Sequence, residues 1–157
     1  LINSAATKRY KSIAIDADDQ RSDLSNLIAQ EIPAVQEEGF VFEFLGCEST
    51  PNTDVPLTCN FLVENSQDAE RKLYIYGNKG SSFSRVIDAS GNEIFASLAT
   101  LGSDSGSGSA DAVFPSRIPL KASLSFSQAP EGGIRILDIG AYTSGVGYFD
   151  VEFRFSR

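Results

Sequence analysis

The sequence predicts an all-β protein, an immunoglobulin-like sandwich of two sheets, with a jelly roll or a small barrel as alternatives. Composition favours this class, because the apolar 41% of the chain is mainly Phe, Ile, Leu, Val and Tyr, residues that suit pleated, half-buried surfaces. Patterning favours it too, since these residues fall in roughly seven to nine short alternating runs, with turns about every eight to twelve residues. A chain of 157 residues is long enough for one core.

Residues 1–38 have a different pattern from the rest of the chain. Alternation is weak from Tyr10 to Ile15, and Asp16 then begins an acidic run suited to a helix N-cap. Four positions that follow have helical spacing, three of them apolar and the last acidic: Leu24, Leu27, Ile28 and Glu31. Pro33 is expected to end that helix. We therefore expect an arm with a short helix over residues 1–38, either packed on the sheet or reserved for a partner, and a sandwich domain over residues 39–157.

The first strands of the sandwich are expected to form a hairpin over residues 40–65. Apolar residues alternate in two runs: Phe40, Phe42 and Phe44, then Val55, Leu57, Cys59, Phe61 and Val63. An antiparallel register that aligns the two cysteines gives three facing pairs: Cys47 with Cys59, Leu45 with Phe61, and Glu43 with Val63.

That register brings the thiols of Cys47 and Cys59 close enough for a cross-strand disulfide. We expect the bridge to form, and with it an oxidising, extracytoplasmic compartment. Two free thiols in a cytosolic strand pair are the alternative.

Short strands continue along the rest of the chain. The alternating runs are Leu73 to Tyr76, Phe83 to Ile87, Ile94 to Leu98, Ala122 to Phe126, Ile134 to Ile139 and Phe149 to Phe155. Residues 88–93 are expected to be the turn of a second hairpin, with Gly91 or Asn92 at positive φ. Residues 101–111 are rich in Gly and Ser and predict an exposed loop. The last run alternates most cleanly, and we expect it to pair inside the core sheet.

The composition argues against several classes of function. A formal net charge of −8 with 13 scattered basic residues does not suit a protein that binds nucleic-acid phosphates. No apolar run approaches the 18 or more residues of a membrane span. The chain has no histidine, which removes His-based triads and His-containing zinc sites. Two carboxylates could still hydrolyse sugars, but the sequence places no two of them together. We therefore expect a non-enzymatic protein.

Two weaker patterns suggest small ligands, and no other cofactor is expected. Asp16, Asp18 and Asp19 have the near-alternate spacing of oxygen ligands for calcium, although they lack the Gly and the distal Glu of an EF-hand loop. Their alternative role is a helix N-cap in a solvated charged segment. Four tyrosines could present rings to a glycan or simply pack half-buried on strands: Tyr74, Tyr76, Tyr142 and Tyr148.

Four segments carry a resemblance to a known group of domains. They are FEFLGC at 42–47, CNFLVEN at 59–65, RVIDASGNE at 85–93 and IPLKASLSF at 118–126. Together they resemble uncharacterised bacterial exported immunoglobulin-like sandwich domains over residues 40–126. The resemblance implies architecture and export, and it carries over no catalytic residue.

The function expected from these observations is that of a structural or interaction protein, such as a surface or filament subunit. The N-terminal arm carries apolar residues that could add a strand to the open sheet edge of a neighbouring molecule: Leu1, Ile2, Ile13 and Ile15. The partner is then another protein or a second copy. A calcium- or carbohydrate-binding module is the alternative, and a domain that docks on another protein cannot be separated from the first reading by sequence.

Overall fold

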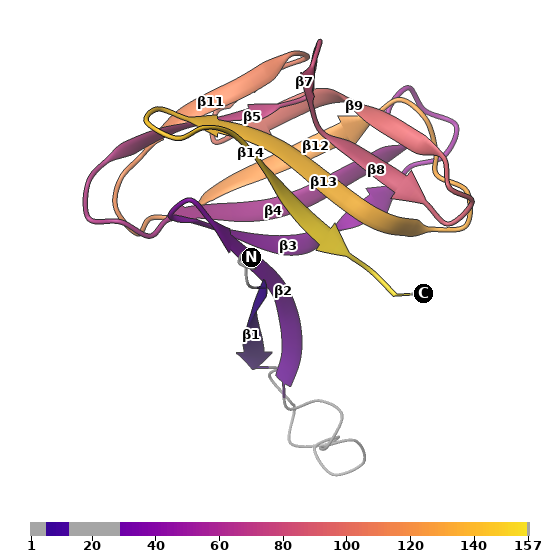
Figure 1. Ribbon diagram of the computed structural model, residues 1–157. Coiled ribbons are helices and arrows are strands. Elements are labelled where there is room, and N and C mark those ends of the chain that lie inside the picture. Colours follow the sequence, from indigo (N-terminus) through magenta and orange to yellow (C-terminus); the bar gives the residue numbers. More distant parts are fainter. Residues whose placement is uncertain (1–5, 13–28, 157) are drawn as a thin grey trace.

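The computed structural model describes the backbone of residues 6–12 and 29–156, and the side chains from Pro33 to Ser156. Every regular element in these residues is a strand, so the all-β prediction is confirmed. Twelve strands belong to one antiparallel sheet that folds over into two layers (Figure 1). The layers face each other as in a β-sandwich.

The strands divide between the layers as follows. The first layer contains, in spatial order, β2 (Ala29–Glu37), β3 (Phe40–Ser49), β4 (Leu57–Asn65), β12 (Leu120–Phe126) and β9 (Glu93–Leu101). The second layer contains β8 (Arg85–Asp88), β13 (Ile134–Thr143), β14 (Gly147–Arg154), β5 (Arg71–Tyr76) and β11 (Ser109–Phe114). The remaining strands are β1 (Ala6–Ser12), which pairs with β2, β10 (Asp104–Gly106), which pairs with β9, and β6 (Asn78–Lys79) and β7 (Ser82–Phe83), which form a small separate sheet.

Strand β9 joins the two layers on one side of the sandwich. Its residues 93–95 pair with β8 in the second layer, and residues from Ala96 to Leu101 pair with β12 in the first. On the opposite side, β2 and β14 lie side by side, and no hydrogen-bonded ladder joins them among the described residues. The sandwich is therefore closed at β9 and open between β2 and β14.

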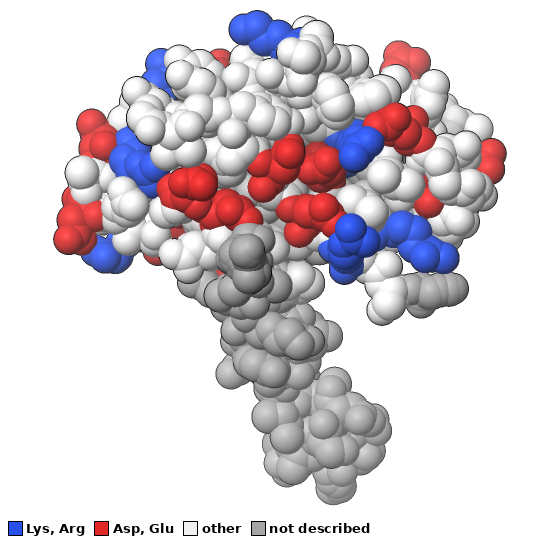
Figure 2. Space-filling view, in the orientation of Figure 1, with Lys and Arg blue, Asp and Glu red and all other residues white. Residues whose placement is uncertain are grey.

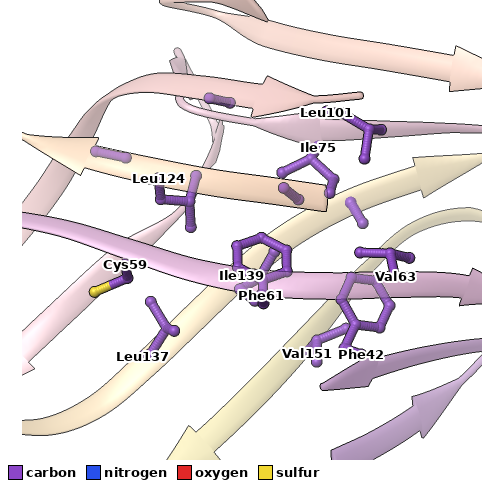
Figure 3. Close-up of a cluster of buried hydrophobic side chains, with 14 of the residues drawn as sticks. Phe42, Cys59, Phe61, Val63, Ile75, Leu101, Leu124, Leu137, Ile139 and Val151 are labelled. Atoms are coloured by element: carbon purple, nitrogen blue, oxygen red, sulfur yellow. The ribbon is translucent and has the colours of Figure 1, made fainter. Parts of the chain in front are cut away.

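The core is one apolar cluster that both layers supply. Its largest fully buried side chains are Phe40, Phe42, Phe61, Phe114, Phe126, Leu73, Ile75, Leu101, Leu124, Leu137, Ile139 and Val63. Figure 3 shows Phe61 of β4 and Ile139 of β13 among the buried side chains that the two layers contribute. Because side chains alternate across a strand, each of these strands also presents every second residue to the outside.

The hairpin of β3 and β4 is present, but its register differs from the predicted one. Cys47 lies opposite Cys59 as expected, while Phe44, not Leu45, lies opposite Phe61. The predicted pairing of Glu43 with Val63 is also wrong, because Glu43 lies opposite Leu62.

A bulge between Phe44 and Gly46 causes this difference. In a regular strand, Phe44 and Cys47 would point to opposite faces, because they are an odd number of residues apart. The bulge leaves Leu45 as an extra, unpaired residue, so Phe44 and Cys47 point to the same face despite the odd spacing. Leu45 is 53% exposed, and Gly46 has φ of 129°, a conformation that Gly adopts easily. The bulge thus brings the Phe run and the disulfide to the core together.

The hairpin predicted around residues 88–93 is confirmed. Val86 of β8 faces Ile94 of β9, and Gly91 has φ of 88°.

Two other expectations are wrong. The Gly/Ser-rich residues 101–111 are not a plain exposed loop, because β10 folds back on β9 and β11 pairs with β5. The last strand, β14, does not lie inside the sheet, since β13 is its one hydrogen-bonded partner among the described strands. Its side chains Phe149, Val151 and Phe153 are nevertheless buried, which explains the clean alternation.

The N-terminal part forms a hairpin. Glu31 and Pro33 lie in β2, so the expected helix does not extend to Pro33, and its part from 16 to 28 falls outside the described residues. Residues 29–35 of β2 pair with β1, and residues 34–37 pair with β3. The predicted boundary after residue 38 falls in the tight turn between β2 and β3, where Glu38 and Gly39 both have positive φ. Figure 1 shows β1 and the start of β2 extending beyond the sandwich.

Candidate functional site

The four tyrosines singled out in the sequence come together on the outer face of the second layer. Leu73 and Ile75 of β5 are buried, so Tyr74 and Tyr76 between and after them point outward. Tyr142 on β13 lies opposite Tyr74 and, on its other side, opposite Tyr148 of β14. Three strands that are distant in sequence therefore contribute to one aromatic cluster.

The rings of the cluster touch in two pairs. Tyr74 and Tyr142 meet edge to face, with 5.8 Å between ring centroids, and Tyr76 and Tyr148 meet at 5.9 Å with tilted planes. Such pairs add about 0.5–1.5 kcal/mol beyond their buried area. Tyr142 and Tyr148 remain 37% and 44% exposed, so both rings are open to a ligand.

Gly140 allows the backbone of the β7 segment and the Tyr148 ring to approach β13. A Cβ atom at Gly140 would lie 2.4 Å from the Phe83 carbonyl oxygen and 3.0 Å from the Tyr148 hydroxyl. The Gly140 amide donates to the Ser84 hydroxyl at 2.9 Å, which fixes the chain above the sheet. A larger residue at this position would push the tyrosine away.

Carboxylates continue the same face along β13 and β14. The Tyr148 hydroxyl donates to Asp150 Oδ1 at 2.6 Å. Asp138 lies opposite Glu152, a like-charge pairing that is unfavourable in a sheet. Figure 2 shows Asp and Glu gathered along the middle of this face, over β13 and β14.

Asp138 is the most constrained of these acids. Its Oδ2 accepts from Arg85 Nε at 3.3 Å, but its Oδ1 is buried and has no hydrogen-bond partner among the described residues. Burial raises the pKa of Asp138 first of all, and the nearby charge of Asp150 raises it further. The Arg85 guanidinium is also shared with Glu93, so it does not balance the acids alone.

The pKa of Tyr148 is raised well above its ordinary value, by burial and by the hydrogen bond to Asp150. Burial also raises the pKa of Tyr76. Both hydroxyls therefore stay protonated, and the charge of the face comes from its carboxylates.

One cation of the same chain already lies at the border of the face. Lys72 Nζ lies 5.1 Å from the ring centroid of Tyr74 and 3.0 Å from Asp111 Oδ2. Ammonium groups are attracted to aromatic faces by about 0.5–1 kcal/mol at exposed sites. The hydrogen bond to Asp111 raises the pKa of Lys72. The local chemistry of ring plus carboxylate thus holds a lysine.

The other residues singled out in the sequence have separate positions. The sulfur atoms of Cys47 and Cys59 are bonded at 2.07 Å. The proposed calcium ligands and arm residues lie outside the described residues: Asp16, Asp18, Asp19, Leu1, Ile2, Ile13 and Ile15. In the described part of the chain, no three His, Cys, Asp or Glu side chains form a group that could hold a metal ion.

Sequence reasoning missed Asp138, Asp150 and Lys72 as members of the tyrosine face. A signal for each existed, because each lies two or four residues from a named tyrosine on the same strand and so shares its face. What the sequence lacked was the strand order that brings β5, β13 and β14 together.

None of the described residues forms a helix long and apolar enough to cross a membrane. Comparison of the chain with protein-family models, curated proteins and solved structures gives no match.

Proposed function

We propose that this protein is a non-enzymatic, extracytoplasmic interaction module that associates with a protein partner through its N-terminal hairpin. The first candidate partner is another copy of the same chain, as in a surface or filament subunit. The sandwich is of the immunoglobulin-like kind in this proposal, in line with the resemblance noted over residues 40–126.

The observation that carries the proposal is the position of β1. This strand pairs with β2 alone among the described strands, and the hairpin extends beyond the sandwich (Figure 1). An unpaired strand edge presents a row of N–H and C=O groups that can pair with another chain. β14 ends the second layer with an edge of the same kind, because it pairs with β13 alone in the described part of the chain.

The end of the β1–β2 hairpin that is nearer the sandwich is held by hydrogen bonds and by buried side chains. The hairpin is therefore well placed to connect the sandwich to a partner. Arg71 Nη1 donates to the Glu38 carbonyl at 2.9 Å, and the Ser66 amide donates to the Gly39 carbonyl at 2.9 Å. Ala34 and Val35 of β2 are buried in the sandwich. The disulfide supports the extracytoplasmic part of the proposal, because such bonds persist in oxidising compartments.

Light scattering after size exclusion tests the proposal on the full chain and on a chain without residues 1–12. The shortened chain keeps every buried core residue, from Ala34 to Phe153, and the disulfide. We expect the full chain to assemble as its concentration rises and the shortened chain to stay monomeric. The matched control is Ile118→Ser, which removes a 51% exposed apolar residue elsewhere and should assemble normally. Two monomers, or two equal assemblies, would refute the role of the hairpin.

A carbohydrate-binding module is the second candidate, and the cluster of four tyrosines supports it. Exposed rings such as Tyr142 and Tyr148 could stack on a sugar. Neutral oligosaccharides should then raise the melting temperature of the full chain, and Tyr142→Ala should abolish that shift. Calcium binding by Asp16, Asp18 and Asp19 stays a prediction: millimolar calcium should raise the melting temperature, and replacing the three residues by Ala should abolish that shift.

A further inference from the structure

We infer that the outer face formed by Tyr74, Tyr76, Tyr142, Tyr148, Asp138 and Asp150 binds the basic β1 strand of a second copy of this chain. We call these six residues the tyrosine–carboxylate face. The inference rests on the proposed function and names the surface that receives the hairpin.

The two surfaces have opposite charge. β1 has the sequence ATKRYKS, with three cations, Lys8, Arg9 and Lys11, and no acid. The chain as a whole has a net charge of −8, so this strand is a local exception. Complementary charge directs the encounter of two surfaces and selects partners more than it adds affinity.

Two cations of the chain border the tyrosine–carboxylate face, Arg85 at Asp138 and Lys72 at Tyr74, and neither pairs with Asp150 among the described residues. Asp150 bonds to the neutral hydroxyl of Tyr148, and no ion pair links it to a cation among the described residues. Asp138 shares Arg85 with Glu93 and lies opposite Glu152. A lysine or arginine brought by a partner would relieve the repulsion among these carboxylates.

Lys72 shows that a tyrosine ring and a carboxylate bind an ammonium group together at the border of the tyrosine–carboxylate face. There, an ammonium group lies over the ring of Tyr74 and pairs with Asp111. Tyr142 and Tyr148 repeat the combination of ring and carboxylate with Asp150, but without a cation. Rings also bind arginine well, because the planar guanidinium stacks on them. The face therefore selects a basic strand over a neutral ligand.

The contact joins two different surfaces, so it is heterologous. The β1–β2 hairpin extends from the open side of the sandwich, whereas the tyrosine–carboxylate face lies on β5, β13 and β14 (Figure 1). A heterologous contact leaves one hairpin and one face free at the ends of every open assembly, so it produces filaments, or rings where the rotation closes, rather than isologous dimers. Growth should continue with concentration.

Two variants of the full chain test the inference. The arm variant is Lys8→Ser, Arg9→Ser and Lys11→Ser, and the face variant is Tyr142→Ser and Asp150→Ser. Each should raise the dissociation constant of assembly at least tenfold by sedimentation velocity, while circular dichroism confirms that it is folded. Asp54→Ser, which removes an exposed acid outside the face, is the matched control and should assemble normally.

Mixing the two variants provides the decisive measurement. The hairpin of the face variant and the face of the arm variant are both intact, so the mixture should form 1:1 dimers that grow no further. Raising the salt concentration should weaken these dimers, because exposed charges are screened.

The possible failures are distinguishable. If the arm variant is monomeric but the face variant assembles fully, the hairpin works and another surface receives it, which refutes this inference alone. If the arm variant, the face variant and the chain without residues 1–12 all assemble as the full chain does, the proposed function fails as well. If the face variant loses binding of neutral oligosaccharides while assembly persists, the face belongs to a carbohydrate and the inference is wrong.

Discussion

Asp88 shows how much one side chain contributes to this fold. Its Oδ1 accepts from the amides of Ser90 at 3.0 Å and Asn92 at 2.8 Å. Its Oδ2 accepts from the Asn92 side chain at 3.1 Å and from the Glu131 amide at 2.8 Å. One buried carboxylate thus joins the turn between β8 and β9 to the segment that precedes β13.

These hydrogen bonds predict how stability depends on pH. The Glu131 amide and then the Asn92 and Ser90 donors hold the pKa of Asp88 below its ordinary value of 3.8, against the effect of burial. Because the pKa is lower in the folded state, the stabilisation is complete above the ordinary value. It is lost as the pH falls through the lower folded-state value.

Asp88→Asn should therefore lower the melting temperature at pH 7, and the difference from the original protein should shrink as the pH falls below 3.8. Thermal unfolding followed by circular dichroism from neutral to strongly acidic pH measures this. Asp68→Asn, at an acid whose side chain is 90% exposed, is the control. A difference that stays constant over the whole range would contradict the assignment.

The disulfide is the second feature at the scale of the residue. Cys47 and Cys59 are 12 residues apart, and a bridge that closes a loop of about this size stabilises by about 3 kcal/mol. We expect the double variant Cys47→Ser, Cys59→Ser to lose about that free energy of unfolding in urea. Reductant should then destabilise the original protein but not the variant. Equal stability of both would show that the bridge constrains nothing in the unfolded chain.

At the scale of the element, the bulge in β3 decides which face of the strand is buried. Deleting Leu45 would remove the bulge and leave only Gly46 between Phe44 and Cys47, so both would stay on the same face of a regular strand, opposite Phe61 and Cys59. We expect the deletion to keep the disulfide and to lower the free energy of unfolding by about 0.5–3 kcal/mol, measured by urea unfolding and thiol titration.

Leu45→Ser is the control for the deletion. It keeps the bulge and changes only a side chain that is 53% exposed, so it should change stability by less than about 0.5 kcal/mol. Two free thiols in the deletion variant would show that Cys47 no longer lies opposite Cys59 and would contradict this register.

Two glycines that flank the turn between β10 and β11 differ in the space around them, and this difference provides a matched pair of variants. A Cβ at Gly106 would lie 2.3 Å from the Ser109 carbonyl oxygen, whereas at Gly108 the nearest atom would be Lys79 Cβ at 3.7 Å. Gly106→Ala should cost about 1–3 kcal/mol by overpacking, and Gly108→Ala less than about 0.5 kcal/mol. Chemical denaturation measures both. Equal tolerance would restore the view of this segment as a plain loop.

At the scale of the whole molecule, the single core predicts a single unfolding transition. Side chains from both layers form one cluster, and β9 runs through both, so neither layer can lose its packing alone. Calorimetry should give equal calorimetric and van't Hoff enthalpies, of about 110 kcal/mol near 60 °C for 157 residues at about 0.7 kcal/mol per residue. Two separated transitions would show that the layers unfold independently.

Much of the fold followed from local alternation. The strands that contain Phe126 and Phe153, the turn at Gly91 and the pairing of Cys47 with Cys59 were all predicted, because period-two patterning and turn residues are properties of neighbouring residues. The four tyrosines were also predicted as candidates. The carboxylates beside them were not, since Asp138 and Asp150 come into view only when β13 and β14 are paired.

The sequence by itself therefore determined most of the strands from Phe40 onward and which of their faces are apolar, but it did not predict β2, β10 or β11. Only the tertiary structure decided that β14 is an edge, that Leu45 forms a bulge, and that Tyr74, Tyr142 and Tyr148 lie on three adjacent strands. The physical reason is that strand pairing joins residues far apart in the chain, and its register depends on the packing of the whole core.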